Sequence, residues 1–377
     1  MYTTLLTEID DVRSLSHAWR KLQPTTPMLT PQWLLSWWET YRGSGANCNR
    51  KQLFFLAVYT DQGQLVGIAP WYQEKSPFSG KTLSFLGTGT VCSDHLSIIC
   101  EPRQEAAVVN ALANWLTGRG ALQWDAIRLE GIDAKDPAIG MLVDHFRENG
   151  LNADVRESIG CWQLELPSTW EEYLQSISKN HRKRCRRWER EFIQTGRSQV
   201  YTATNKEELA LGFQILQRLH NQRRQSLGER GIFESDQFKE FHESALPRLL
   251  DHNQLRLSWL EIDRKPAACE YQLLGNDSIH AYQSGVAPEF LDVGAGNLSV
   301  LISIKTGIES GLRLFDFMRG DEAYKAKWGA TRRSMNNVLI RQNNMTGTIR
   351  HAMARTNYHS KQWIKNLATS LAVGSEA

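Results

Sequence analysis

The sequence has 377 residues, of which 41% are hydrophobic and 23% charged, with a formal net charge of +3. This balance is typical of an ordinary globular protein of two or three domains and does not favour a general nucleic-acid binder. No stretch holds the roughly 18 apolar residues that cross a bilayer. The first residues, MYTTLLTEIDDV, lack the basic and apolar regions of a signal peptide. We therefore expect a cytoplasmic protein with no transmembrane segment.

The cysteines are scattered along the chain and form no Cys-x-x-Cys pair or close cluster with histidine. They are Cys48, Cys92, Cys100, Cys161, Cys185 and Cys269. Metal sites built from cysteine need such a cluster, and disulfides are rare in the cytosol. We therefore expect reduced thiols and no metal.

The first half of the chain alternates between helical and strand patterns. Apolar residues recur at helical spacing over 7–22 and 30–42, where Thr30 and Pro31 have the residue types of an N-cap and a first helical position. A hairpin follows, with strands at 53–60 and 65–75 around the turn DQGQ. The later predicted elements are strands at 81–87 and 94–100, a helix at about 103–118, a strand at 125–132, a helix at about 137–149 and strands near 151–166.

A basic helix is predicted between the two halves. It starts at a capping box of Ser168 and Glu171 and ends at Gly196. Its predicted buried stripe consists of Leu174, Ile177, His181, Cys185, Trp188 and Phe192. Residues 179–190 carry seven Lys or Arg and one Glu, and outside them acidic residues outnumber basic ones. Three interpretations of these charges remain open: a solvated helix face, contact with a polyanion such as tRNA or the CoA 3′-phosphate, and attraction to a membrane surface.

The second half repeats the order of the first. Helices are predicted at about 205–227 and 235–250, then a hairpin over 255–274, a third strand at 278–286, a helix at about 297–310 and a strand at 312–318. Its hairpin resembles that of the first half, with a strand, a tight turn and small residues in the returning strand. The repeated order predicts two copies of one α/β unit.

Gly294, Gly296 and Asn297 stand where the strand at 278–286 passes into the following helix. Glycine lets the backbone approach a bulky anion, and a helix N-terminus offers free N–H groups and positive charge. This pattern suits a pyrophosphate, and the alternative is a tight connection capped by Asn297. It is not a Walker A loop, because no Gly-Lys-Ser/Thr follows.

Several motifs, in this order along the chain, resemble those of the GNAT acyltransferases. They are TPQWLLSWWETY, LVGIAPW, FLGTGTVCSDHL, the basic RKRCRRWEREF, Gly294 with Gly296, GLRLFDF and GDEAYKAKW. Over about residues 25–340 the chain is similar, more narrowly, to the CelD-type acetyltransferases found with cellulose and exopolysaccharide biosynthesis. Leu291 stands where the usual GNAT loop has Gln or Arg. The doubled architecture also resembles the Fem peptidyltransferases, which take an aminoacyl group from tRNA rather than from CoA.

The resemblance implies an α/β fold of two tandem GNAT-like units, with mixed sheets flanked by helices. We expect a degenerate N-terminal unit at 1–166 that shapes the acceptor site, and a basic connecting helix at 167–196. An acyl-CoA-binding unit at 197–345 and a tail at 346–377 follow. In the tail, QWIKNLATSLAV suggests a last short helix.

The function implied is acyl transfer from acyl-CoA, with acetyl-CoA as co-substrate, to an amine on a sugar or other polar metabolite in polysaccharide biosynthesis. Gly294, Gly296 and Asn297 would hold the acyl-CoA. Two rivals remain: an aminoacyl-tRNA-dependent Fem-like transferase, with tRNA as partner, and a non-catalytic GNAT-like scaffold in polysaccharide assembly. The oligomeric state does not follow from the sequence.

Acyl transfer to an amine needs a base, a polarised carbonyl and an acid for the leaving thiolate. The resemblance makes Tyr324 the candidate acid, and packing of its helix on the sheet is the alternative. Glu270 is a candidate base, because the apolar run PAACEYQLLG would bury its carboxylate and raise its pKa. Asp316 is a second candidate base or amine ligand, unless it caps a turn.

Substrate contacts are predicted at Asp94, Glu322 and Lys325. The resemblance places Asp94 in the cleft between the halves. Glu322 would hold the amine, and Lys325 a phosphate or an acidic substrate. The alternatives are a Glu322–Lys325 pair and a solvated lysine. His280 and Tyr282 alternate on the strand beside Glu270, where a histidine is more often structural.

Overall fold

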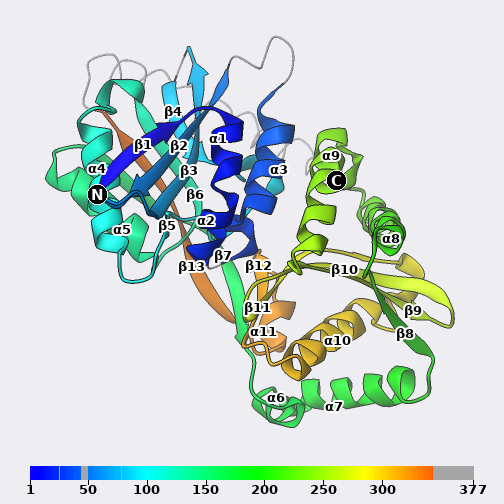
Figure 1. Cartoon of the computed structure of the whole chain (residues 1–377). Helices are drawn as coiled ribbons and strands as arrows, with labels where there is room; N and C mark the ends of the chain where they lie inside the picture. Colours follow the sequence, from blue (N-terminus) through cyan, green and yellow to red (C-terminus); the bar gives the residue numbers. More distant parts are fainter. Residues whose placement is uncertain (25, 44–49, 78, 343–377) are drawn as a thin grey trace, which may run out of the picture.

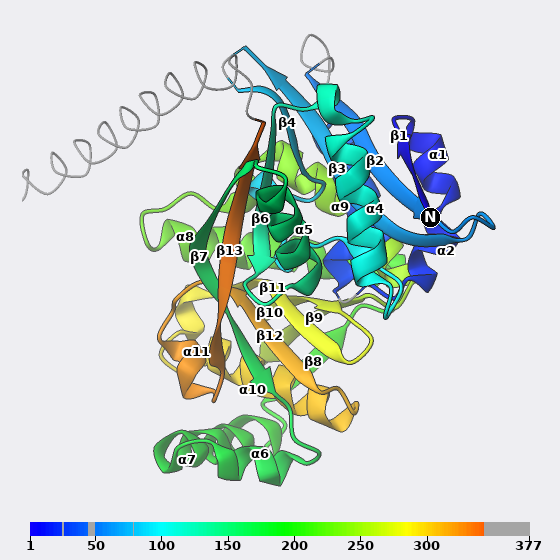
Figure 2. The same cartoon turned by 90° about the vertical axis from the view of Figure 1, so that its left-hand side faces the viewer.

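A computed structural model describes residues 1–342 with the exception of 25, 44–49 and 78. The predicted tail at 346–377, its short helix and Cys48 lie outside the described residues. In the described part of the chain, no helix is long and apolar enough to cross a membrane. The strands form one continuous mixed sheet flanked by helices (Figures 1 and 2), which confirms the predicted α/β class.

The first half follows the predicted order in most elements, but β1 was not predicted and the helix predicted over 7–22 is divided into α1 and α2. Its elements are β1 (Tyr2–Leu6), α1 (Ile9–Ser14), α2 (Ser16–Lys21), α3 (Pro31–Tyr41), β2 (Lys51–Tyr59), β3 (Leu65–Ser76), β4 (Gly80–Phe85), β5 (Ile99–Cys100), α4 (Glu105–Thr117), β6 (Ala126–Asp133), α5 (Pro137–Glu148) and β7 (Asn152–Glu165). The strand predicted at 94–100 is reduced to β5, because 86–98 is a loop that packs against the end of β6. Thr30 is the N-cap of α3 and Pro31 its first residue, as predicted.

The second half repeats this plan with an additional helical segment before it. Its elements are α6 (Trp170–Ser176), α7 (Lys179–Trp188), a π-helical turn (Glu189–Ile193), β8 (Ser198–Thr202), α8 (Lys206–Gln225), α9 (Asp236–Asp251), β9 (Leu255–Ile262), β10 (Lys265–Leu274), β11 (Ser278–Val286), α10 (Ala295–Glu309), β12 (Leu314–Arg319), α11 (Tyr324–Lys327) and β13 (Thr331–Arg341). The sequence pattern did not predict β8 or β13 as strands.

The predicted single basic helix is wrong in two details. The capping box is formed by Thr169 and Glu172, one residue later than predicted, because the Thr169 hydroxyl accepts from the Glu172 N–H. Ile177 is extended and Ser178 caps a second helix, so the segment is split into α6 and α7. The predicted stripe is nevertheless buried throughout.

The sheet order shows how the two halves are joined. The strands run β1-β2-β3-β4-β6-β13-β7-β12-β11-β10-β9-β8. The last strand of each half lies in the centre, where β13 pairs with both β6 and β7, and β7 pairs with both β13 and β12. If each strand of the first half is exchanged for the corresponding strand of the second half, β1 for β8 and β7 for β13, the same strand order results, read from the other edge of the sheet. Each half completes the sheet of the other, and Figure 2 shows β7 and β13 running side by side.

Each half contains one parallel strand pair, which opens into a fork. In the first half β4 pairs with β6 only at Thr82 and Leu83, and in the second half β11 pairs with β12 only over Ser278–His280. Beyond these residues the two strands of each pair separate. In the second half α8 and α9 cover one face of the strands and α10 covers the other (Figure 1).

Candidate active site

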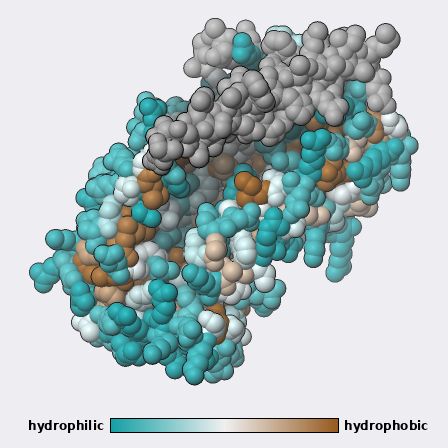
Figure 3. All heavy atoms as spheres, turned by 180° about the vertical axis from the view of Figure 1, so that it is seen from behind, coloured by the Kyte–Doolittle hydropathy of each residue, from teal (hydrophilic) through white to brown (hydrophobic). Residues whose placement is uncertain are grey.

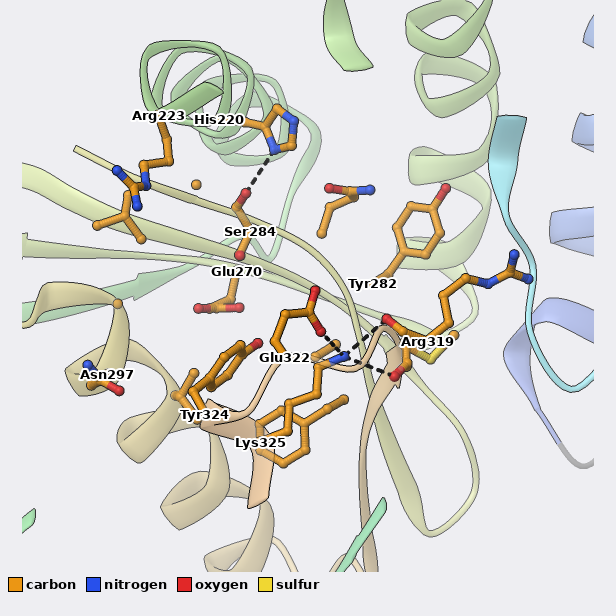
Figure 4. A pocket seen from close by; sticks show the side chains of 18 of the residues that line it. His220, Arg223, Glu270, Tyr282, Ser284, Asn297, Arg319, Glu322, Tyr324 and Lys325 are labelled. Atoms are coloured by element: carbon orange, nitrogen blue, oxygen red, sulfur yellow. Dashed lines mark hydrogen bonds and ion pairs between the residues drawn. The ribbon is translucent and has the colours of Figure 1, made fainter. Parts of the chain in front are cut away.

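A cavity of about 670 Å³ opens at the fork between β11 and β12. The side chains that bear on its chemistry come from segments of both halves, and most of them are drawn in Figure 4. They are Asp94, His220, Arg223, Arg224, Glu270, Tyr282, Asn297, Arg319, Glu322, Tyr324 and Lys325. The fold thus gathers most of the predicted site residues in one place, although Gly294 and Asp316 are not among the lining residues.

The start of α10 forms one wall of the cavity, through Gly296 and Asn297. Gly294 is the N-cap with φ of 80°, a left-handed conformation that glycine adopts without strain. A Cβ on Gly294 would lie 3.2 Å from the Trp188 ring. Asn297 lies inside the helix, so the alternative that it caps the connection is wrong. The first N–H groups of α10 have no helical partner and lie at the cavity end of the helix.

Glu270 reaches the cavity from β10 and is 6% exposed. Ser299 of α10 donates a hydrogen bond of 2.8 Å to its Oε1. Burial raises the pKa of Glu270 to about 7, and the Ser299 hydrogen bond opposes part of this rise. A carboxyl with this pKa changes its protonation near neutral pH, as a general base must.

Tyr324 is the first residue of α11, and its hydroxyl points toward Glu270 across the cavity (Figure 4). Its side chain is 42% exposed, and its ring meets Phe317 edge to face at 6.3 Å between centroids. Partial burial, then the charges of Glu270 and Glu322, raise the pKa of Tyr324. The hydroxyl therefore stays protonated and can serve as a proton donor, while its ring also packs on β12.

Lys325 and Glu322 form the ion pair that the sequence analysis named as an alternative, with 2.9 Å between Nζ and Oε2. Lys325 is 2% exposed, so it is not a solvated lysine. Its ammonium also donates to the carbonyls of Met318, Arg319 and Gly320, at 3.2, 3.0 and 3.1 Å. Lys325 therefore fixes the end of β12 and the position of the Glu322 carboxylate.

Asp316 is fully buried behind the cavity. Its Oδ2 accepts from Gln163 at 2.8 Å and lies 2.8 Å from Nε2 of His95, and its Oδ1 accepts from the Met318 N–H at 2.6 Å. Burial alone would raise the pKa of Asp316, but His95 and its other partners hold it at about 2. The last bond supports Met318 at φ of 60°, where β12 turns into the cavity wall.

His95, Cys161 and Asp316 also bring three possible metal-ligand atoms within 4.8 Å of one another. Both oxygens of Asp316 already take part in hydrogen bonds. Burial, then the nearby Asp94 and Asp316, raises the pKa of the Cys161 thiol. In this structure Asp316 joins His95, Gln163 and Met318 in a buried hydrogen-bond network.

The first half supplies the far wall of the cavity through the loop at 86–98. Asp94 lines the cavity and accepts from Nε of Arg319 at 2.6 Å and from the Arg319 N–H at 3.1 Å. Tyr282 of β11 also lines it and donates a 2.8 Å bond to the Val91 carbonyl of the same loop. His280 lies deeper, 3.1 Å from the Ser278 hydroxyl, and burial lowers its pKa to about 4.

The contribution of α8 to the cavity was not predicted from the sequence. His220, Arg223 and Arg224 line the cavity, and Nδ1 of His220 lies 3.0 Å from the Ser284 carbonyl of β11. The signal was present in the sequence, because these residues continue the inward face of the helix at helical spacing.

Residues 179–326 match the family model described as an acetyltransferase (GNAT) domain. No curated protein gives a match. A structure titled "Crystal structure of FemX" superposes with a TM-score of 0.62 at 12% identity, covering 90% of this chain and 97% of that one. A conserved protein of unknown function from Bacteroides thetaiotaomicron gives 0.53 at 8% identity, with 90% and 99% covered. These structures share the two-unit fold, and the match at 179–326 identifies a GNAT-type transferase domain in this chain.

Proposed function

We propose that the protein transfers an acyl group, in the first instance acetyl, from acyl-CoA to an amine on a sugar or other polar metabolite. One observation carries the proposal. Within a single cavity, Glu270, whose pKa is about 7, lies opposite the protonated Tyr324 and beside the N-terminus of α10. A base, an acid and an anion-binding helix end are the parts that this reaction needs.

The donor site is proposed at Gly294, Gly296 and Asn297. The free N–H groups at the start of α10 would bind the pyrophosphate, as helix N-termini do elsewhere. A Cβ on Gly296 would lie 3.1 Å from Cγ2 of Val286, so a larger side chain would close this end of the cavity. The backbone edge that β11 exposes after leaving β12 would polarise the thioester carbonyl.

The chemical step is an exchange of one bond for another. The amine nitrogen attacks the thioester carbon, the C–N bond forms and the C–S bond breaks. Glu270 takes the proton that the attacking nitrogen loses, directly or through water. Tyr324 gives its proton to the departing thiolate. The two groups then recover their protonation states by exchange with solvent.

The acceptor amine is proposed to bind beside Glu322, whose carboxylate is 57% exposed and held by Lys325. Lys325 would thus act on the substrate through Glu322. Asp94 and Asp316 would shape the acceptor end by fixing Arg319 and Met318. In this proposal the unit at 1–166 shapes the acceptor site and the unit at 197–345 binds the acyl donor. Residues 167–196 connect the two units. The resemblance to CelD-type enzymes supports a cytoplasmic amino sugar of polysaccharide synthesis as the acceptor.

A second candidate is transfer from aminoacyl-tRNA, the donor of the Fem peptidyltransferases. Two observations favour it: the fold similarity to FemX and the charges of α7. Lys179, Lys183, Arg184 and Arg190 form no ion pair with any described residue. Seen from behind, the end of the molecule that carries α6 and α7 is hydrophilic (Figure 3). A phosphate backbone fits such a surface.

A thermal-shift experiment separates these donors, because a ligand that binds only the folded state stabilises it by about 2.7 kcal/mol at a hundredfold excess over Kd. The chain is heated alone, with acetyl-CoA, with longer acyl-CoAs and with tRNA. We expect acetyl-CoA to raise the melting temperature. A rise with tRNA alone would establish the second candidate, and no rise with any donor would leave a non-catalytic scaffold.

A further inference from the structure

The face of α8 that points into the protein is mostly apolar along the helix but becomes positively charged where it reaches the cavity. Leu209, Phe213, Leu216 and His220 are buried at helical spacing. Arg223 and Arg224 follow His220 at three and four positions and therefore continue the same face, and Leu227 lies just beyond the end of the helix. All three line the cavity, so two guanidinium groups stand where the preceding turns place apolar side chains.

The last turns of α8 are held close to β11. A Cβ on Gly285 would lie 2.6 Å from the backbone nitrogen of His220, so no larger residue fits between the helix and the strand. Nδ1 of His220 lies 3.0 Å from the Ser284 carbonyl on the same strand. Arg223, one turn further on, is thereby directed over the fork (Figure 4).

Two of the Asp, Glu, Lys and Arg side chains that line the cavity form no ion pair with any described residue: Arg223 and Glu270, which is bonded to Ser299. Asp94 is paired with Arg319, Glu322 with Lys325, and Arg224 with Glu229 at 2.7 Å. Arg223 is half-buried and has no carboxylate partner among the residues described, and its Nη1 makes one contact of 3.4 Å with the Ser226 hydroxyl. A partly desolvated cation without a counter-charge favours an anionic ligand.

The position of Arg223 indicates which substrate carries that anion. α8 and α10 cover opposite faces of the strands (Figure 1), and the proposed donor site lies at the α10 end. We infer that Arg223, supported by Arg224, binds an anionic group of the acceptor. The acceptor is therefore an amine that also carries a phosphate or a carboxylate. This inference rests on the proposed function for the identity of the two substrates.

A purely structural role would also explain both arginines, because cations in the last turn of a helix interact favourably with the helix dipole. That role predicts a lower melting temperature on substitution and no anion binding. The test therefore measures anion binding, by the full chain and by two variants. Arg223→Gln removes the cavity cation, and Arg218→Gln removes an exposed arginine of the same helix that does not line the cavity.

Inorganic phosphate is titrated into each protein by calorimetry, with and without saturating acetyl-CoA. We expect saturable phosphate binding to the wild type, at least tenfold weaker binding to Arg223→Gln, and unchanged binding to Arg218→Gln and to the acetyl-CoA complex. Equal binding by wild type and Arg223→Gln would overturn the anion site. Displacement of phosphate by acetyl-CoA would assign Arg223 to the donor and overturn the acceptor assignment. If acetyl-CoA itself fails to bind, the proposed function fails, while the phosphate titration still decides whether the anion site exists.

Discussion

In the first half of the chain β4 and β6 separate beyond Leu83, as β11 and β12 do in the second half beyond His280. The two forks are filled differently. The loop at 86–98 packs across the first fork, with Leu86, Val91, Leu96 and Ile98 buried. In the second half only Ala287–Gly294 precedes α10, and the fork is left as a cavity.

The loop at 86–98, which packs across the first fork, also forms part of the wall of the cavity at the second fork. Its Leu96 N–H donates to the Gly131 carbonyl of β6 at 3.0 Å, while its Cys92 and Asp94 line the cavity of the other half. The same segment therefore closes one fork and forms a wall at the other. Under the proposed function, the second half holds the chemistry and this loop of the first half shapes the site.

The largest expected effect comes from Glu270, which lines the cavity of the second fork. Glu270→Gln should lower kcat by about 10²–10⁴-fold, because it removes the proposed base. In the wild type kcat/KM should rise with pH through about 7, since only ionised Glu270 accepts a proton. Steady-state kinetics across pH check this, and Ser299→Ala should move the rise to higher pH because its hydrogen bond favours the ionised form.

If kcat/KM of the Glu270→Gln protein still rises with pH through about 7, that rise reports the titration of another group. Unchanged kcat in a folded Glu270→Gln protein would remove Glu270 from the chemistry. The two forks would then differ in shape only.

Asp316→Asn should weaken the contact between the halves and cost about 3–5 kcal/mol of the free energy of unfolding, because it breaks a buried ionic pair with His95. The pKa of Asp316 is about 2 in the folded protein, below its ordinary value. Its stabilising contribution is therefore present above pH of about 4 and lost as the pH falls toward 2. Urea unfolding at pH 6 and pH 3 measures both effects.

The matched control is Asp251→Asn, an exposed carboxylate at the end of α9. It should change the free energy of unfolding by less than about 0.5 kcal/mol at either pH. Equal effects of the two variants would show that the buried network does not hold the halves together.

Tyr324→Phe keeps the ring and its contact with Phe317 and should lower kcat at least tenfold, while acetyl-CoA affinity stays within a few-fold. Kinetics and a binding isotherm on one preparation check this. Normal kcat would leave Tyr324 as a packing residue. Loss of both binding and stability would show that its role is to hold α11 on the sheet.

The smallest effect is expected at the basic helix, which lies outside both forks. Changing Arg182, Lys183 and Arg186 to Gln should leave turnover of a small acceptor within about twofold, because their charges face away from the buried stripe. A collapse of CoA-dependent turnover would place α7 in the active site. Binding of tRNA that is lost in this variant and falls steeply with salt would favour the aminoacyl-tRNA donor.

The repeated hairpins and helices were predictable, because period-two and helical spacing depend on each segment alone. The positions of β7 and β13 in the sheet of the opposite half were not predictable, since the sequence of a strand does not determine which strand it pairs with. β13 itself was missed: TRRSMNNVLIR mixes polar and apolar residues without a clean alternation. It is identifiable as a central strand only once β6 and β7 are seen on either side of it.

Within the site, the residues found from sequence were those whose local pattern is unusual. Glu270 interrupts an apolar strand, and two glycines stand at the start of a helix. The location of Asp316 could not be foreseen, because its partners His95 and Gln163 come from the other half of the chain. The inward direction of Arg223 is implied by helical spacing, but its significance depends on the fork that it faces.

The central claim is that the second fork, and not the first, binds acyl-CoA at the start of α10. It is tested most directly by an acetyl-CoA binding isotherm on the wild type, Gly296→Val and Gly140→Val. Gly140 lies exposed in α5 of the first half, with open space around its Cβ position. We predict saturable binding by the wild type and Gly140→Val, and at least tenfold weaker binding by a folded Gly296→Val protein. Equal affinity of Gly296→Val and the wild type would contradict the claim.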